Sequence, residues 1–188
     1  SDLIKSVKNF NSYHIFGTDE LGRDVLMRLV YGTQVSMGVG VLVAIVSAFI
    51  GLLVGSLAGY YGGTIDTILM RTTDALLSLP LLPVLVVIAA IDLQKVPFLS
   101  TITKYGNESI IKLVFILCLF SWMVVARLVR GSILSLRERE FILAAKTLGA
   151  TDATIIIRHM FPNVIAPLLV SVTLGVGESI LFEAALSF

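Results

Sequence analysis

The side chains able to do chemistry in this chain are few, and they lie far apart in the sequence. His14 and His159 fall in separate polar segments, and the single cysteine, Cys118, falls in an apolar run. No cysteine–histidine cluster or paired-histidine helix offers a metal site, and no GxxxxGK[ST] loop offers a phosphate site. No spacing gathers Ser, His and Asp into a catalytic group. We therefore expect a chain that is not an enzyme and that holds no metal or cofactor itself.

Carboxylates placed in or beside apolar segments are the remaining chemical signal. Glu178 interrupts an apolar segment, and Asp74 and Asp92 flank another. An ionisable group inside a membrane is costly and usually faces protein or water. Glu178 is therefore a candidate pathway residue, although a position near the outer interface is an equal alternative. Three such carboxylates also leave open an ion-coupled secondary transporter or channel.

The composition requires elements that sit in a membrane. The chain has 188 residues, of which 56% are hydrophobic and 14% are charged, and its mean hydropathy is +0.95. Soluble domains carry about 25% charged residues. Here the charges also leave long windows empty, which indicates an all-α, polytopic membrane protein. The net charge of +1 gives no indication of a nucleic-acid partner.

Four transmembrane spans are expected, at about 35–59, 75–91, 113–129 and 164–181. Pro80 and Pro83 predict a bent second span, because proline removes a backbone donor. Residues 1–33 then form an external segment with an interfacial helix, and 34–188 form the transmembrane domain. Gly62-Gly63 predicts a turn followed by a short interfacial helix, and the polar stretch 93–112 predicts an exposed loop.

Small residues recur every fourth position along the first expected span. In lipid, such a stripe lets another helix approach closely, because packing drives helix association there. We expect it to pack against a neighbouring helix rather than to reflect the general tolerance of membrane helices for glycine. The stripe comprises Ser47, Gly51, Gly55 and Gly59.

Basic residues set the expected orientation. They concentrate in 127–160, at Arg127, Arg130, Arg137, Arg139, Lys146 and Arg158. The positive-inside rule places that segment in the cytoplasm. Four spans then put residues 60–74 inside as well, and 1–33 and 93–112 outside.

The cytoplasmic segment 134–163 is too elaborate for a simple connection. A helix is expected with Leu134, Phe141, Ala145 and Leu148 on one face. Gly149 should end it at positive φ, and Thr151-Asp152 should cap a second short helix that Pro162 closes. A short helix that shows apolar residues to the cytoplasm fits a groove on another protein. A helix resting on lipid headgroups explains the pattern equally well.

Three motifs resemble one family. Leu143-Ala144-Ala145, followed by Gly149 and then Pro162, resembles the EAA loop of ABC importer permeases, with Leu143 at the usual glutamate position. Residues 17–24, GTDELGRD, resemble the GTDxxGRD signature of the dipeptide/oligopeptide/nickel group, and 182–188 resemble its EAxLSF run. Apart from the resemblance, residues 17–24 read as a turn in which Thr18 or Asp19 caps a helix.

The resemblance implies a fold, partners and roles. It implies a type I ABC importer fold, of which this chain would lack the first and sixth helices, in a bacterial inner membrane. It implies a homologous second permease, two ATP-binding subunits holding ATP and Mg²⁺, and an external solute-binding protein. The substrate would be a peptide or a related small solute such as nickel.

The same resemblance implies roles for individual residues. Coupling to the ATPases would fall to Ala144, Ala145, Gly149, Asp152, Arg158 and Pro162 within the 141–162 loop. The external motif would comprise Gly17, Thr18, Asp19, Gly22, Arg23 and Asp24. Glu183 would have a structural role at an outer gate.

Overall fold

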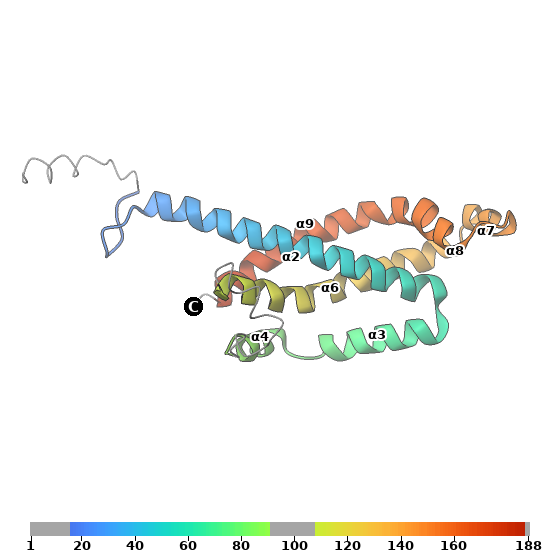
Figure 1. Ribbon diagram of the computed structural model, residues 1–188, viewed down its shortest axis with the longest axis horizontal. Coiled ribbons are helices and arrows are strands. Elements are labelled where there is room, and N and C mark those ends of the chain that lie inside the picture. Colours follow the sequence, from blue (N-terminus) through green and yellow to red (C-terminus); the bar gives the residue numbers. More distant parts are fainter. Residues whose placement is uncertain (1–15, 91–107, 187–188) are drawn as a thin grey trace, which may run out of the picture. The chain divides into compact units, whose positions relative to one another are not determined.

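The computed structural model describes residues 16–90 and 108–186, and their regular elements are helical. Figure 1 shows the helices in chain order. They are α2 (Val25–Tyr61), α3 (Gly63–Leu77), α4 (Leu81–Ala90), α6 (Glu108–Arg137), α7 (Glu140–Thr147), α8 (Asp152–Thr154), a π-helix η2 (Ile155–Met160) and α9 (Phe161–Leu186). Contacts divide the chain into residues 1–38 and 39–188, and α2 begins in the first unit and continues in the second.

Three helical runs in the described residues are long and apolar enough to cross a membrane. They are Val25–Tyr61, Ile110–Arg137 and Asp152–Ala185. The all-α, polytopic class is therefore confirmed. Each run is longer than the span expected from hydropathy, because the backbone continues helical into the flanking polar residues. In particular, α2 is unbroken from Val25, so the expectation of a separate interfacial helix before residue 35 is wrong.

The second expected span, 75–91, is divided in the structure. Residues 75–77 complete α3, and the Ser78 and Leu79 N–H groups bond back to the carbonyls of Asp74 and Leu76. Pro80 then precedes α4, which has 10 residues. A helix needs about 20 residues to cross a bilayer, so α4 does not span one alone. Residue 91, Asp92 and the loop as far as 107 lie outside the described residues, whereas 108–112 are helical rather than loop.

The turn predicted at Gly62-Gly63 is confirmed, with φ of 66° and 55°. It reverses the chain between α2 and α3. The helix that follows, α3, has 15 residues and packs against α6. Within residues 39–188, α6 also packs on α9 and α4, so it is the central helix of this unit.

Close packing joins the second part of α2 to α6. A Cβ added at Gly51 would lie 2.5 Å from the Val125 Cβ, and one at Gly55 would lie 2.5 Å from the Ala126 carbonyl oxygen. At Gly59 the corresponding contact is the Arg130 carbonyl oxygen, at 3.0 Å. These three glycines of the stripe therefore let the two backbones approach to distances that no other side chain would permit.

Two apolar cores fill the unit 39–188. The first gathers buried side chains of α2, α6, α7, η2 and α9, namely Tyr60, Val125, Val129, Ile133, Ile142, Ile155, Met160 and Val164. The second lies between α2 and α6 and comprises Val39, Val43, Ile116, Leu117, Phe120 and Met123. The first core is the one that positions the candidate site.

Candidate functional site

The candidate site is the connector between α6 and α9, residues 138–160. Helix α7 ends in a Schellman motif, in which the Gly149 N–H donates to the Lys146 carbonyl and the Ala150 N–H to the Ala145 carbonyl, each at 3.0 Å. Gly149 has φ of 82°, as the sequence predicts. A residue with a Cβ is strained at this φ, so glycine fixes the angle between the two arms of the connector.

The second arm begins at a capped turn and leads directly into α9. The Thr154 N–H donates to the Thr151 hydroxyl oxygen at 3.3 Å, which confirms Thr151 as the predicted N-cap. The helix does not end at Pro162. That residue is the second of α9, which follows the π-helix η2 directly. The expectation that Pro162 closes a separate short helix is therefore wrong: the run 152–186 is continuous.

The apolar face that the connector turns toward the core differs from the face predicted from the sequence. Helix α6 ends at Arg137 and α7 begins at Glu140, so Leu134 and Phe141 lie on different helices. The side chain fully buried in α7 is Ile142. The predicted stripe was based on a single helix through 134–148, and the break after Arg137 shifts its register.

Several large apolar side chains of the connector therefore point outward. Leu148 is 87% exposed and Ile157 is 64% exposed. Phe141 and Leu143 are exposed too. Soluble surfaces rarely gather such residues unless something covers them, so this outward face of the connector is a candidate docking surface.

The predicted coupling residues all lie on or beside this connector. Ala144, Asp152, Arg158 and Pro162 are exposed, and Ala145 is half-buried. Asp152 is the first residue of α8, Arg158 belongs to η2, and Gly149 forms the turn. His159 is half-buried in η2. The connector brings the whole set together within one segment of chain.

One contact of the connector comes from a residue that the sequence pattern did not single out. The Tyr60 hydroxyl, at the end of α2, donates to the Asp152 Oδ1 at 2.6 Å. The Lys146 Nζ lies 4.9 Å from the centroid of the Tyr60 ring. Tyr60 follows directly on the glycine stripe, and that adjacency is the only sequence signal that could have drawn attention to it.

Two ion pairs join α3 to α6 beside the connector. Arg130 makes a bidentate contact with Asp66, through Nε to Oδ1 and through Nη2 to Oδ2 at 2.6 Å. Arg127 Nη2 contacts Asp74 Oδ1 at 2.5 Å. The hydrogen bond from Arg130 is the main reason that the pKa of Asp66 lies below its ordinary value, with the Arg130 and Arg137 charges adding to it. Asp74 is thus engaged in an ion pair.

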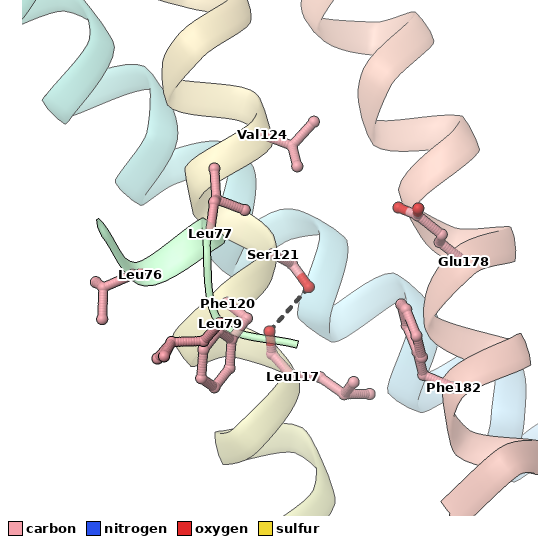
Figure 2. Close-up of a pocket in the computed structure, with 9 residues that line it drawn as sticks. All are labelled: Leu76, Leu77, Leu79, Leu117, Phe120, Ser121, Val124, Glu178 and Phe182. Atoms are coloured by element: carbon pink, nitrogen blue, oxygen red, sulfur yellow. Dashed lines mark hydrogen bonds between the residues drawn. The ribbon is translucent and has the colours of Figure 1, made fainter. Parts of the chain in front are cut away.

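Glu178 faces a cavity between α9, α6 and the end of α3. Figure 2 shows its carboxylate pointing from α9 toward Val124 and Ser121 of α6, with Leu76 and Leu77 beyond. The cavity has a volume of about 110 Å³ and is otherwise lined mostly by leucine and phenylalanine. Glu178 itself is exposed, and it is the one carboxylate among the residues that line this cavity.

The remaining predicted residues lie elsewhere. Ser47, fully buried and without a hydrogen-bond partner in the described part of the chain, lines a small cavity of about 30 Å³ together with Glu178. Glu183 is half-buried, and its Oε2 likewise has no partner among the described residues. His14, Asp92, Ser187 and Phe188 lie outside the described residues.

In the first unit, residues 17–24 form a tight, self-bonded turn. Asp19 Oδ1 accepts the N–H groups of Leu21 and Arg23 at 2.9 and 2.8 Å, and Arg28 Nη1 contacts Oδ2 at 2.5 Å. The Arg23 N–H is the main reason that the pKa of Asp19 is lowered.

Glycines and a cap complete this turn. Gly17 and Gly22 have φ of 76° and 73°. Asp24, rather than Thr18 or Asp19, caps α2, since its Oδ1 accepts the Leu26 N–H at 2.8 Å. The residues of the GTDELGRD signature therefore form and stabilise this turn.

Among the described residues no group of His, Cys, Asp or Glu could hold a metal ion.

Comparison with known proteins agrees with this arrangement. Residues 51–188 match the family described as binding-protein-dependent transport system inner membrane component. The chain is 42% identical over 175 residues to the dipeptide transport system permease protein DppC of Bacillus subtilis, covering 93% of this chain and 50% of that protein. It is 34% identical over 188 residues to the oligopeptide transport system permease protein OppC of the same organism, covering 100% and 57%.

A third relative, the oligopeptide transport system permease protein OppC of Mycobacterium bovis, is 41% identical over 175 residues, covering 93% of this chain and 56% of that protein. The chain thus spans about half the length of the curated relatives it matches. The family match covers most of the chain and includes the connector and all of α6 and α9. The chain therefore belongs to the family of inner membrane components of binding-protein-dependent transport systems.

Proposed function

We propose that this chain is the transmembrane permease part of an ATP-driven importer, with the connector as the docking surface for a cytoplasmic ATPase. The observation that supports it is the outward apolar face of the connector: Phe141, Leu143 and Leu148 lie on or directly after α7, and Ile157 lies on η2. The helical run that bears Ile157 continues without a break into α9. A displacement of residues 152–160 by an ATPase would be transmitted along that helix into the membrane. ATP and Mg²⁺ would be held by the ATPase subunits.

The proposed assembly has three kinds of protein partner. The chain would pair with a homologous permease, and the complex would contain two ATP-binding subunits on the cytoplasmic side and a solute-binding protein on the other side of the membrane. The family description names binding-protein dependence. The central cavity of the permease pair would then open alternately to each side of the membrane as the ATPases close and separate.

A cross-link tests the docking surface. We would replace Cys118 by Ser in the full-length permease, introduce Ile157→Cys, and co-express the candidate ATPase subunits. Ile157 is exposed on η2, so we expect an ATPase adduct whose yield changes with nucleotide. Glu20→Cys, in the segment expected outside, is the matched control and should give none. Absence of an Ile157 adduct, together with transport that survives ATP depletion, would favour the ion-coupled alternative.

For the substrate we propose peptides, because the relatives are named as dipeptide and oligopeptide permeases. Glu178 and its cavity would belong to the pathway, and Glu183 to a gate. Uptake of a radiolabelled tripeptide and of radiolabelled nickel by the complete system separates the two solute classes. Peptide uptake abolished by unlabelled peptide but unaffected by nickel is the expected result, and the reverse pattern would assign the system to nickel.

A further inference from the structure

We infer that the Tyr60 hydroxyl is a direct link by which movement of the connector reaches α2. The chain attaches the connector covalently to α6 and to α9, but α2 has no such attachment. The Tyr60–Asp152 hydrogen bond joins residues 92 positions apart. This inference rests on the proposed coupling to an ATPase and names the contact that would carry the movement to a third helix.

The bond has the features of a strong one. Its length of 2.6 Å falls in the range of hydroxyl–carboxylate hydrogen bonds, which are about twice as strong as neutral ones. Tyr60 is only 6% exposed, whereas its acceptor Asp152 is exposed, so the bond is shielded from water on the tyrosine side. Asp152 is the first residue of the continuous helical run that leads into α9. A force on that end of the run therefore acts directly on Tyr60.

Tyr60 also touches the other arm of the connector. The ammonium group of Lys146, in α7, lies 4.9 Å from the centroid of the Tyr60 ring, within the range of a cation–π contact. One side chain thus contacts both α7 and α8, on either side of the Gly149 turn. This arrangement holds the two arms against α2 together, so the connector would move as one body.

The end of α2 is packed too closely against α6 to absorb a movement of the connector. Gly59 precedes Tyr60 and packs against α6, where an added Cβ would meet the Arg130 carbonyl oxygen and the Ile133 Cβ at 3.0 Å. Gly55 packs still closer, one turn earlier. Packed helices of this kind shift together rather than deform. A pull on Tyr60 is therefore passed to α2 and α6 as a pair.

Removal of one oxygen atom tests the inference. We would reconstitute the full-length permease with its second permease, its ATPase subunits and its binding protein, and measure tripeptide uptake and ATP hydrolysis together. Tyr60→Phe should reduce the amount of tripeptide taken up per ATP about ten-fold or more, the effect of losing a hydrogen bond to a charged group. ATPase co-purification should be unchanged, because Tyr60 is buried and is not one of the exposed side chains of the outward face.

The matched control is Tyr61→Phe. Tyr61 is 50% exposed, and its ring meets Tyr60 edge-on with the centroids 5.2 Å apart. This variant removes a neighbouring hydroxyl without touching Asp152, so uptake per ATP should be that of the unaltered protein. Asp152→Ala should reproduce the Tyr60→Phe loss, and the double variant should lose no more than either single one.

The outcomes separate the two proposals. A Tyr60→Phe protein that couples as well as Tyr61→Phe, in a complex that retains its ATPase, overturns the link but leaves the docking surface intact. Additive losses for Tyr60→Phe and Asp152→Ala overturn it as well, since the residues would then act independently. An unaltered protein that binds no ATPase overturns the proposed function itself. If Tyr60→Phe lowers the yield of folded protein, Asp152→Ala supplies the comparison in a complex that retains its ATPase, because Asp152 also lies on the connector.

Discussion

At the scale of single residues, two arginines of α6 pair with two aspartates of α3 in very different surroundings. The Arg130 and Asp66 side chains are 33% and 18% exposed, whereas those of Arg127 and Asp74 are 48% and 59% exposed. We predict that Arg130→Ala lowers the free energy of unfolding by about 2 kcal/mol, because it strands a partly buried carboxylate. Arg127→Ala, the matched control, should cost under about 1 kcal/mol. Thermal unfolding in detergent ranks the two, and equal losses would contradict the prediction.

The Asp66 pair also predicts a pH dependence of stability. Its pKa is lowered in the folded protein, so the unfolded chain takes up the proton first as the pH falls. The stabilisation is present above the unfolded pKa, about 4, and is lost as the pH falls through the folded value below it. Thermal unfolding of the unaltered protein and of Asp66→Asn should therefore differ by a constant amount at neutral and mildly acidic pH. The difference should shrink only below about pH 4; a change near pH 6 would implicate another group.

Residue types predicted local geometry well and distant contacts poorly. Gly149 and Thr151 were predictable because a helix end needs a residue at positive φ and a hydroxyl cap within a few positions. The partner of Asp152 was not, since Tyr60 lies 92 positions away and a tyrosine at the end of an apolar helix has many other uses. The ion pair of Asp66 with Arg130 could not be predicted for the same reason. The sequence places both residues near one side of the membrane but does not show which charged residues pair.

At the scale of the elements, the contact between α2 and α6 depends on the absence of side chains. A Cβ at position 55 would lie 2.5 Å from the Ala126 carbonyl oxygen and 2.8 Å from the Val129 Cβ. We predict that Gly55→Ala forces the helices apart and costs about 1–3 kcal/mol. The control is Gly131→Ala in α6, where a Cβ meets nothing within 4 Å and helix propensity favours alanine. Thermal unfolding in detergent should show a lower midpoint for Gly55→Ala alone, and a matching fall for Gly131→Ala would point to a general effect of the substitution.

Hydropathy located the apolar middle of each membrane helix but not its ends or its breaks. The four-residue spacing from Ser47 to Gly59 predicted a packing face, yet the partner helix, α6, follows only from the three-dimensional structure. Polar residues at the ends of α6 and α9 stay helical because backbone hydrogen bonding continues regardless of side-chain polarity. The π-helix at 155–160 had no sequence signal: its one extra residue per turn lets Ile155 and Met160 both reach the first core.

At the scale of the whole molecule, contacts and charge together predict how the chain crosses the membrane. Tyr60 bonds to Asp152 and Asp66 to Arg130, so the α2–α3 turn and the connector lie at the same end of the unit 39–188. This agrees with the expected four-span topology, in which 60–74 and 127–160 share one side. The agreement holds even though α4, part of the second expected span, is too short to span a membrane alone. The family motifs were recognisable from sequence because they depend on local turns, such as the one held by Asp19.

The sidedness itself can be measured. In a full-length permease with Cys118 replaced by Ser, we would introduce single cysteines at Thr64, Thr154 or Glu20, all exposed, and label intact cells with a membrane-impermeant thiol reagent. Thr64→Cys and Thr154→Cys should behave alike, whichever way the protein is inserted, because the contacts place both segments at one end. The basic residues of 127–160 predict that both are protected in intact cells and label only after permeabilisation. Glu20→Cys should label in intact cells. Opposite labelling of Thr64→Cys and Thr154→Cys would contradict the Tyr60–Asp152 contact, whereas labelling of both in intact cells would reverse the orientation and remove the connector from any cytoplasmic ATPase.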